Sequence, residues 1–159
     1  MYLWFVLIIY NLLFPIVFLL LLPGYFIKVF KRGNYKNSFS ERLGFFSSDK
    51  EKKLSQLKRP IWIHAVSVGE VNIAKKLIFS LKKLYPNHSI VLSTTTPTGY
   101  SIASGSRADL VFYQPLDFFF IINRVFKLID PGCLVLTEAE VWPNLVNKAH
   151  KKRVEVSLI

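Results

Sequence analysis

Glu70 is the first residue of this sequence whose type and position could do chemistry. It follows an apolar run of strand length at residues 61–66 and a small polar turn, which places it in the first turn of a helix. A carboxylate just past the end of a strand can take a proton from a hydroxyl nucleophile, as a general base does. Gly69 beside it would let a substrate approach the backbone closely. Ser67 and Glu70 also have the spacing of a capping box, in which both side chains serve only the helix end, so both roles stay open.

A second acidic group, Glu138 and Glu140, again follows an apolar strand. Two carboxylates at positions i and i+2 share one face of an extended segment, so they repel each other unless a hydroxyl, a basic residue or a helix end stabilises them. The alternative is that Glu140 interacts with the positive end of the helix that begins at Pro143, and that Trp142 only packs.

Residues 94–99, with the sequence Thr-Thr-Thr-Pro-Thr-Gly, form a third candidate. Hydroxyl groups at a helix amino terminus suit a sugar or a phosphate, although β-branched strand residues and a helix cap explain the same residue types. His64, in mid-strand, is expected to be a hydrogen-bonded core residue. The sequence has neither the Cys, His or Asp spacing typical of metal ligands nor a glycine-rich phosphate loop, so no metal or cofactor is expected.

The elements that must position these residues alternate along the chain. Strands are predicted at residues 61–66, 89–95, 110–113, 133–137 and 154–159. Helices are predicted between them, from the Ser67 cap to residue 84 and at residues 97–104, 116–128 and 143–151. Such alternation with short connections predicts an α/β fold, a mostly parallel sheet with right-handed crossovers and helices on both faces. All three candidate groups then lie at the carboxyl edge of the sheet, where ligands bind in open α/β folds.

Length and charge narrow the class of protein. The 159 residues are enough for one domain of ordinary size, and a hydrophobic fraction of 52% excludes a disordered or fibrous chain. A net charge of +11 favours an anionic partner. Nucleic acid is not expected, because no basic helix or interleaved aromatic platform accompanies the charge. The single cysteine, Cys133, lies in an apolar run and is expected to be a small core residue.

The amino-terminal region predicts a membrane anchor. Residues 3–22 carry no charge and are long enough to cross a bilayer, so residues 1–27 are interpreted as a transmembrane anchor rather than a cleaved signal peptide. Basic residues follow the apolar run and none precedes it, which places the rest of the chain in the cytoplasm. Residues 28–59 hold ten Lys and Arg and are interpreted as a basic juxtamembrane connector, either a topology signal or a contact with anionic lipid headgroups. Residues 60–159 would form the Rossmann-like domain.

Four segments taken together closely resemble the amino-terminal half of 3-deoxy-D-manno-octulosonic acid (Kdo) transferase, namely Glu41-Arg-Leu-Gly44 and residues 63–70, 93–99 and 138–144. The resemblance implies one Rossmann-like, acceptor-side domain of a two-domain (GT-B type) glycosyltransferase at the inner membrane. Such an enzyme is inverting and metal-independent, and it transfers Kdo from CMP-Kdo to a lipid A precursor in lipopolysaccharide core synthesis. The carboxyl-terminal donor domain would be absent from these residues, so they are expected to be inactive unless it is supplied.

The resemblance also implies roles for the residues. Glu70 would be the catalytic base, and Glu140, or else Glu138, the second essential carboxylate. The acceptor cleft would be lined by Ser67, Gly69, Thr96, Pro97, Thr98, Gly99, Trp142 and Asn144. The family usually has Glu-Thr-Glu where this chain has Glu-Ala-Glu, which removes one hydroxyl beside the acid pair. The alternative function is that of a non-catalytic, membrane-anchored module that binds anionic lipid or a protein.

Overall fold

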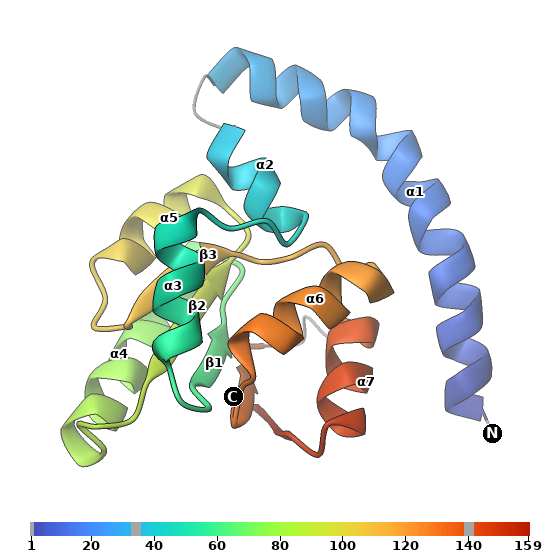
Figure 1. Ribbon diagram of the computed structural model, residues 1–159. Coiled ribbons are helices and arrows are strands. Elements are labelled where there is room, and N and C mark those ends of the chain that lie inside the picture. Colours follow the sequence, from blue (N-terminus) through green and yellow to red (C-terminus); the bar gives the residue numbers. More distant parts are fainter. Residues whose placement is uncertain (1, 33–35, 139–141) are drawn as a thin grey trace.

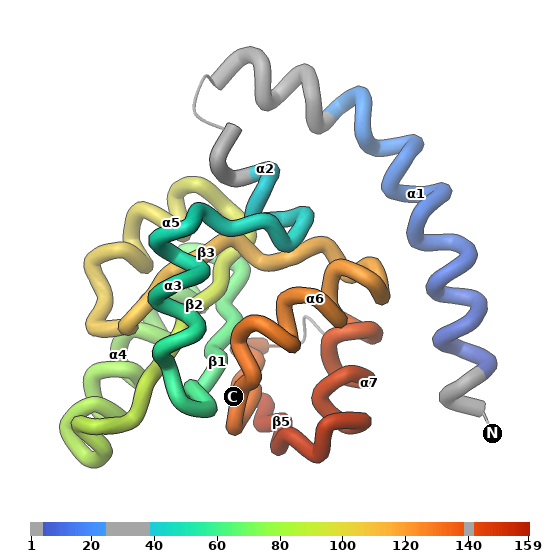
Figure 2. The backbone as a smooth tube through the Cα atoms, viewed as in Figure 1, coloured from blue at the N-terminus to red at the C-terminus, as the bar shows by residue number. Residues whose placement is uncertain are grey.

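The computed structural model describes residues 2–32, 36–138 and 142–159 (Figures 1 and 2). It confirms the predicted α/β fold. In chain order the elements are α1 (Tyr2–Arg32), α2 (Lys36–Arg42), α3 (Ser48–Gln56), β1 (Ile61–His64), α4 (Val68–Leu84), β2 (Ile90–Thr94), α5 (Pro97–Ser104), β3 (Leu110–Tyr113), α6 (Phe119–Ile129), β4 (Cys133–Leu136), α7 (Pro143–Lys151) and β5 (Glu155–Leu158).

The five strands form one parallel sheet in the order β3-β2-β1-β4-β5. The strand β1 lies at the centre, and its last residue, His64, is paired with Ser93 of β2 and with Leu136 of β4. The carboxyl ends of the three central strands therefore meet at one edge of the sheet. The loops that carry the candidate residues all start from this edge.

Helices cover both faces of the sheet, as the alternation of elements predicts. On one face α4 and α5 pack over β1 and β2, with Ile63, Val71 and Ile78 fully buried. On the other face α3, α6 and α7 enclose a larger aromatic core that includes Trp62 and Phe112. Buried residues on both faces explain why the central strands are almost continuously apolar.

Residues 28–59, interpreted from the sequence as a connector, contain the helix α2 and the helix α3. Phe46 and Leu54 from this region are buried in the core with α6, and Ser47 caps α3 by accepting a hydrogen bond from the Lys50 N–H. The packed domain therefore begins before residue 60. The sequence did not predict this packing, because α3 is rich in lysines and acids and has one buried residue, Leu54.

Several predicted boundaries differ from the structure by one to three residues, and two of the differences have a clear reason. The first strand ends at His64 rather than at residue 66, since the next residues form the turn that caps α4. The helix α6 begins at Phe119 rather than at residue 116. Leu116 donates its N–H to the Arg42 carbonyl, and the Asp117 side chain accepts the N–H groups of Asn144 and Leu145. The last strand spans Glu155–Leu158 rather than residues 154–159.

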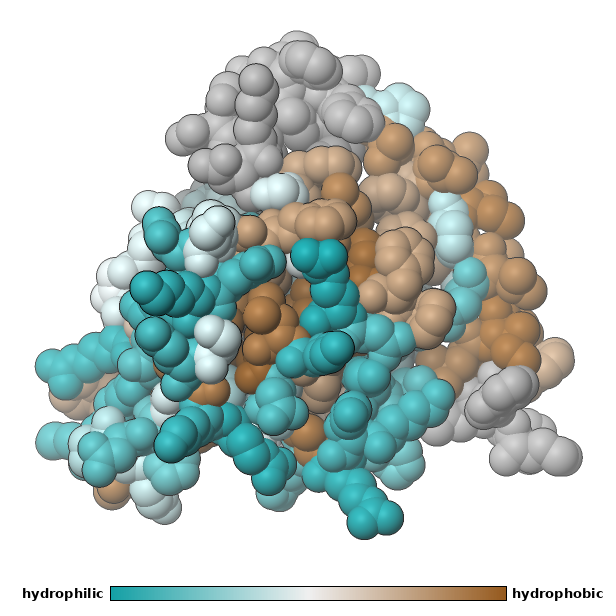
Figure 3. Space-filling view, viewed as in Figure 1, coloured by the Kyte–Doolittle hydropathy of each residue, from teal (hydrophilic) through white to brown (hydrophobic). Residues whose placement is uncertain are grey.

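The helix α1 runs along one side of the domain, outside its layers (Figure 1). Its segment Phe5–Gly24 has a mean hydropathy of 2.8 and is long and apolar enough to cross a membrane. Figure 3 shows hydrophobic residues gathered along this helix, while hydrophilic residues dominate the lower part of the visible face. Phe14 and Phe18 of α1 each contact the ring of Phe118 edge-on.

Candidate active site

The Glu70 side chain lies at the amino terminus of α4, directly past the carboxyl end of β1. Its oxygen Oε1 accepts the Ser67 N–H at 3.0 Å, and Oε2 accepts the Val66 N–H at 2.8 Å. The Ser67 hydroxyl in turn accepts the Glu70 N–H at 3.2 Å. This is the predicted capping box, complete in both directions. Glu70 is 5% exposed, whereas Ser67 and Gly69 beside it are exposed, so the site is open to solvent at this turn.

Hydrogen bonds keep Glu70 charged. Burial raises the pKa of its carboxyl group, but the bonds from Val66, from Ser67 and from the Thr137 hydroxyl outweigh burial, so its pKa lies below the ordinary value. Thr137 comes from the end of β4, and its Oγ1 lies 3.1 Å from Glu70 Oε2. In the sequence Thr137 is next to the acid pair. Its contact with Glu70 arises because β4 pairs with β1 in the sheet.

His64 is the buried centre of a hydrogen-bond network, as expected for a core histidine. Its Nε2 lies 3.2 Å from the Trp142 indole N–H, which can only donate, so Nε2 accepts and Nδ1 carries the proton. Nδ1 then donates to Ser93 at the end of β2, whose Oγ is 3.0 Å away. Burial lowers the pKa of His64 to about 4, although the Ser93 bond and the Glu70 charge oppose this change. His64 is therefore neutral at neutral pH.

The threonine-rich loop lies next to the Glu70 turn. The Thr95 hydroxyl donates to the Val66 carbonyl at 3.3 Å, and the Thr96 hydroxyl caps α5 by accepting the Gly99 N–H at 3.0 Å. A side chain at Gly99 would come within 2.6 Å of the Thr94 hydroxyl, so only glycine fits. These contacts confirm the capping interpretation of this loop. They leave Pro97 and Thr98 exposed at the same edge of the sheet as Glu70.

The Glu41-Arg-Leu-Gly44 segment fastens the amino-terminal helices to this edge. The Glu41 carboxylate forms an ion pair with Lys50 at 2.6 Å and accepts the Tyr113 N–H at 2.9 Å. Arg42 donates to the Thr95 carbonyl in the threonine-rich loop, and its guanidinium lies over the Tyr113 ring. The segment therefore connects α2 to the threonine-rich loop and to β3.

Asn144 occupies a second polar centre, beside α1 rather than beside Glu70. Its Nδ2 donates to the Asp117 carbonyl at 2.5 Å and to Asn11 Oδ1 at 2.9 Å, and its Oδ1 accepts from Asn11 Nδ2 at 3.1 Å. The fully buried Asp117 carboxylate accepts the N–H groups of Asn144 at 2.8 Å and of Leu145 at 3.0 Å. Asp117 thus caps α7, which has no side-chain cap of its own. Nothing in the sequence pointed to Asp117, since a cap supplied by the distant loop before α6 leaves no local signal at α7.

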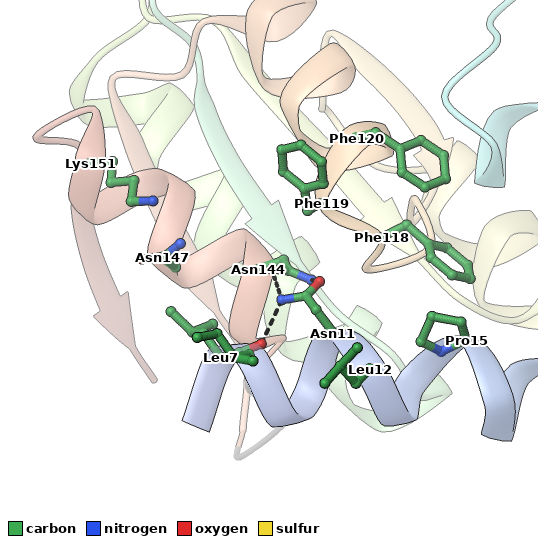
Figure 4. Close-up of a pocket in the computed structure, with 11 residues that line it drawn as sticks. Leu7, Asn11, Leu12, Pro15, Phe118, Phe119, Phe120, Asn144, Asn147 and Lys151 are labelled. Atoms are coloured by element: carbon green, nitrogen blue, oxygen red, sulfur yellow. Dashed lines mark hydrogen bonds between the residues drawn. The ribbon is translucent and has the colours of Figure 1, made fainter. Parts of the chain in front are cut away.

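An apolar groove of about 420 Å³ lies between α1 and the amino termini of α6 and α7 (Figure 4). Leu7, Leu12 and Pro15 of α1 line one wall, and the aromatic run beginning at Phe118 lines the other. Asn144 forms part of the polar side of the groove, with Asn147 and Lys151 further along α7.

The acid pair is described only in part. Glu138 is exposed, has a left-handed backbone with φ of 60°, and donates its N–H to the Ile159 carbonyl at 2.9 Å. Glu140 lies outside the described residues, so its predicted role stays a prediction. Trp142, two residues on, is held by His64. Within residues 2–32, 36–138 and 142–159 the structure shows no group of His, Cys, Asp and Glu that could hold a metal ion.

Fold and site together define a Rossmann-like α/β domain with a charged carboxylate at the ligand-binding edge of its sheet. The sequence model of the family described as 3-Deoxy-D-manno-octulosonic-acid transferase (kdotransferase) matches residues 37–159. The chain belongs to this family.

Individual relatives agree with this assignment. The chain is 35% identical over 126 residues to a 3-deoxy-D-manno-octulosonic acid transferase of Haemophilus influenzae, covering 78% of this chain and 29% of the relative. It is 34% identical over 157 residues to a bifunctional glycosyltransferase/methyltransferase of Fusobacterium nucleatum subsp. nucleatum, covering 94% and 22%. A third relative, a 3-deoxy-D-manno-octulosonic acid transferase of Chlamydophila psittaci, is 30% identical over 145 residues, covering 89% and 33%. The chain thus spans a third or less of the length of these curated relatives.

Proposed function

We propose that these residues form the acceptor-activating half of a Kdo transferase, an inverting and metal-independent glycosyltransferase of lipopolysaccharide synthesis. In this proposal Kdo passes from CMP-Kdo to a hydroxyl group of a lipid A precursor. The observation that carries the proposal is the charged, hydrogen-bonded Glu70 carboxylate at the open turn before α4, in a chain of this family.

The hydrogen bonds of Glu70 favour one of its oxygens as the base. A carboxylate oxygen offers about two acceptor positions. Oε2 accepts from two partners in the protein interior, the Val66 N–H and the Thr137 hydroxyl, whereas Oε1 accepts the N–H of the exposed Ser67. Oε1 would therefore take the proton of the acceptor hydroxyl while its oxygen attacks the anomeric carbon of Kdo and CMP leaves with the bonding electrons.

The remaining candidates complete this proposal. Glu140, or else Glu138, is the second essential carboxylate. Exposed groups at the same edge, among them Ser67, Thr98 and Pro97, line the acceptor cleft, and Trp142 borders it. Asn144, whose amide is occupied by Asp117 and Asn11, would contribute through the helix α1 rather than through a direct contact. In this proposal the donor site belongs to a further domain; the relatives are about three or more times as long as the part that this chain matches.

We further propose that α1 attaches the protein to the inner membrane with the domain on the cytoplasmic side. The apolar segment Phe5–Gly24 and the basic residues that follow it support this topology. A membrane-bound domain with a net charge of +11 suits a phosphorylated, lipid-linked acceptor in the same leaflet.

The decisive experiment replaces Glu70 in a complete, two-domain enzyme that contains this domain. Glu70→Gln keeps much of the capping geometry but removes the proton acceptor, so transfer should fall by roughly two to four powers of ten with little loss of stability. Ser67→Ala is the second variant: it removes the cap at about 1 kcal/mol, together with the bond from the Ser67 side chain to Glu70, and keeps the carboxylate, so it should lower stability more than transfer. Near-normal transfer by folded Glu70→Gln enzyme would end the general-base assignment.

A second function, that of a non-catalytic membrane module binding anionic lipid or a protein, is favoured by the complete capping box, which gives Glu70 a structural role without chemistry. We expect the 159-residue polypeptide by itself to bind a lipid A precursor weakly and to transfer no Kdo from CMP-Kdo. Both functions predict this result. Measured transfer by this polypeptide would contradict that expectation. Restoration of transfer by an added donor domain would argue against the module.

A further inference from the structure

The Thr137 hydroxyl lies between two acceptors but has one hydrogen to give. Its Oγ1 is 2.7 Å from the His64 carbonyl oxygen and 3.1 Å from Glu70 Oε2, and Thr137 is 2% exposed. A hydroxyl hydrogen can rotate between such partners. The His64 carbonyl does not depend on it, because this oxygen also accepts the Thr137 N–H at 3.0 Å. The hydroxyl can therefore turn to either acceptor without leaving a buried group unpaired.

We propose that Thr137 is a positioning residue for Glu70: its hydroxyl donates to the charged carboxylate and turns to the His64 carbonyl when Glu70 takes up a proton. The proposal rests on the general-base role proposed above for Glu70. It assigns to Thr137 the holding of the charged carboxylate and the release of that carboxylate on protonation, without contact with the reacting atoms.

The relative strengths of the hydrogen bonds from the Thr137 hydroxyl to Glu70 and to the His64 carbonyl support this rotation. A charged carboxylate is the stronger acceptor, so the hydroxyl points to Glu70 before reaction. When Oε1 gains the proton, Oε2 becomes a neutral carbonyl-type oxygen, and the His64 carbonyl at the shorter distance becomes the better partner. Oε2 still keeps the Val66 N–H, so the protonated side chain stays in place.

Neutral hydrogen-bond donors, rather than basic side chains, stabilise the Glu70 carboxylate. None of the described residues forms an ion pair with Glu70. His64 of β1 is the titratable neighbour that interacts with it, and His64 is neutral because it is buried. Glu138 follows Thr137 but is exposed, and its backbone has a φ of 60°. The Thr137 hydroxyl is thus the buried side-chain donor to the Glu70 carboxylate; the exposed Ser67 side chain and the two backbone N–H groups are its other donors.

The first test needs no activity. The Glu70 carboxyl carbon is followed by NMR in the full 159-residue chain in detergent micelles, labelled at glutamate and assigned by Glu70→Gln. Thr137→Val, which keeps the side-chain shape, should raise the pKa of Glu70 by about one pH unit, and Thr137→Ser should restore it. Thr137→Ala is the second variant without a hydroxyl, should Thr137→Val fail to fold. An unchanged Glu70 titration in whichever folded variant lacks the hydroxyl would overturn the proposal.

The second test separates this inference from the proposed function. In a complete two-domain enzyme, Thr137→Val should shift the acid limb of the kcat/KM profile upward by the same amount, whereas Thr137→Ser should not. A changed Glu70 titration with an unmoved acid limb would overturn the positioning role. Full activity of Glu70→Gln enzyme would overturn the general base itself, whatever the titration shows.

Discussion

Two buried acids of this domain, Glu70 and Asp117, do the same structural work but differ in their charge behaviour. Each accepts two backbone N–H groups near the amino terminus of a helix, Glu70 for α4 and Asp117 for α7. The pKa of Glu70 lies below its ordinary value, while burial raises the pKa of Asp117 to about 6 in spite of its bonds from Asn144, Tyr10 and Leu145.

The difference lies in what surrounds each carboxyl group. Glu70 is next to an exposed turn and receives a hydroxyl donor from Thr137 as well as its backbone donors. Asp117 is 0% exposed and hydrogen-bonds to the amino terminus of α7 and to Tyr10 of α1. Hydrogen bonds of similar number therefore outweigh desolvation at one site and not at the other. A charged carboxylate beside an exposed turn fits the general-base role proposed for Glu70, whereas the buried Asp117 caps α7.

The largest effect on stability is expected from removing the Asp117 cap. Asp117→Ala leaves the N–H groups of Asn144 and Leu145 buried without an acceptor, so it should cost about 2–3 kcal/mol of unfolding free energy at pH 5. Urea unfolding of the full chain in detergent measures it. Asp49→Ala is the matched control, an exposed acid in the first turn of α3 that should change stability by less than about 0.5 kcal/mol. Equal effects of the two substitutions would refute the cap.

A smaller effect is expected from pH, because the contributions of the two acids to the free energy of unfolding are lost in opposite directions of pH change. Because the folded-state pKa of Asp117 is raised, its contribution is complete below about pH 4 and is lost as pH rises through about 6. The cost of Asp117→Ala should therefore shrink between pH 5 and pH 8 by on the order of 1–3 kcal/mol. The pKa of Glu70 is lowered, so its contribution is present above about pH 4.3 and is lost on acidification. The cost of Glu70→Gln should then stay constant between pH 5 and pH 8, and a parallel change for both acids would remove the distinction.

Much of the candidate site follows from local sequence. The capping box at Ser67 and Glu70, the cap at Thr96 and the alternation of strands with helices are set by residues three to four positions apart or by short periodic patterns, and the structure has all of them. The apolar character of α1 is likewise a property of consecutive residues. Such features could be predicted because their interactions are local.

Only the tertiary structure decided which side chains meet across the sheet. Thr137 reaches Glu70 because β4 pairs with β1, a contact over 67 positions of sequence. Asn144 turns to Asn11, 133 positions away, instead of to the candidate site, and Asp117 caps a helix that begins 26 positions later. Propensity and spacing carry no information on such pairs, because each forms only when burial of the two cores brings separate elements together. The sequence thus determined that a carboxylate would lie at the start of α4. The packing decided that the pKa of Glu70 is lowered and that the pKa of Asp117 is raised.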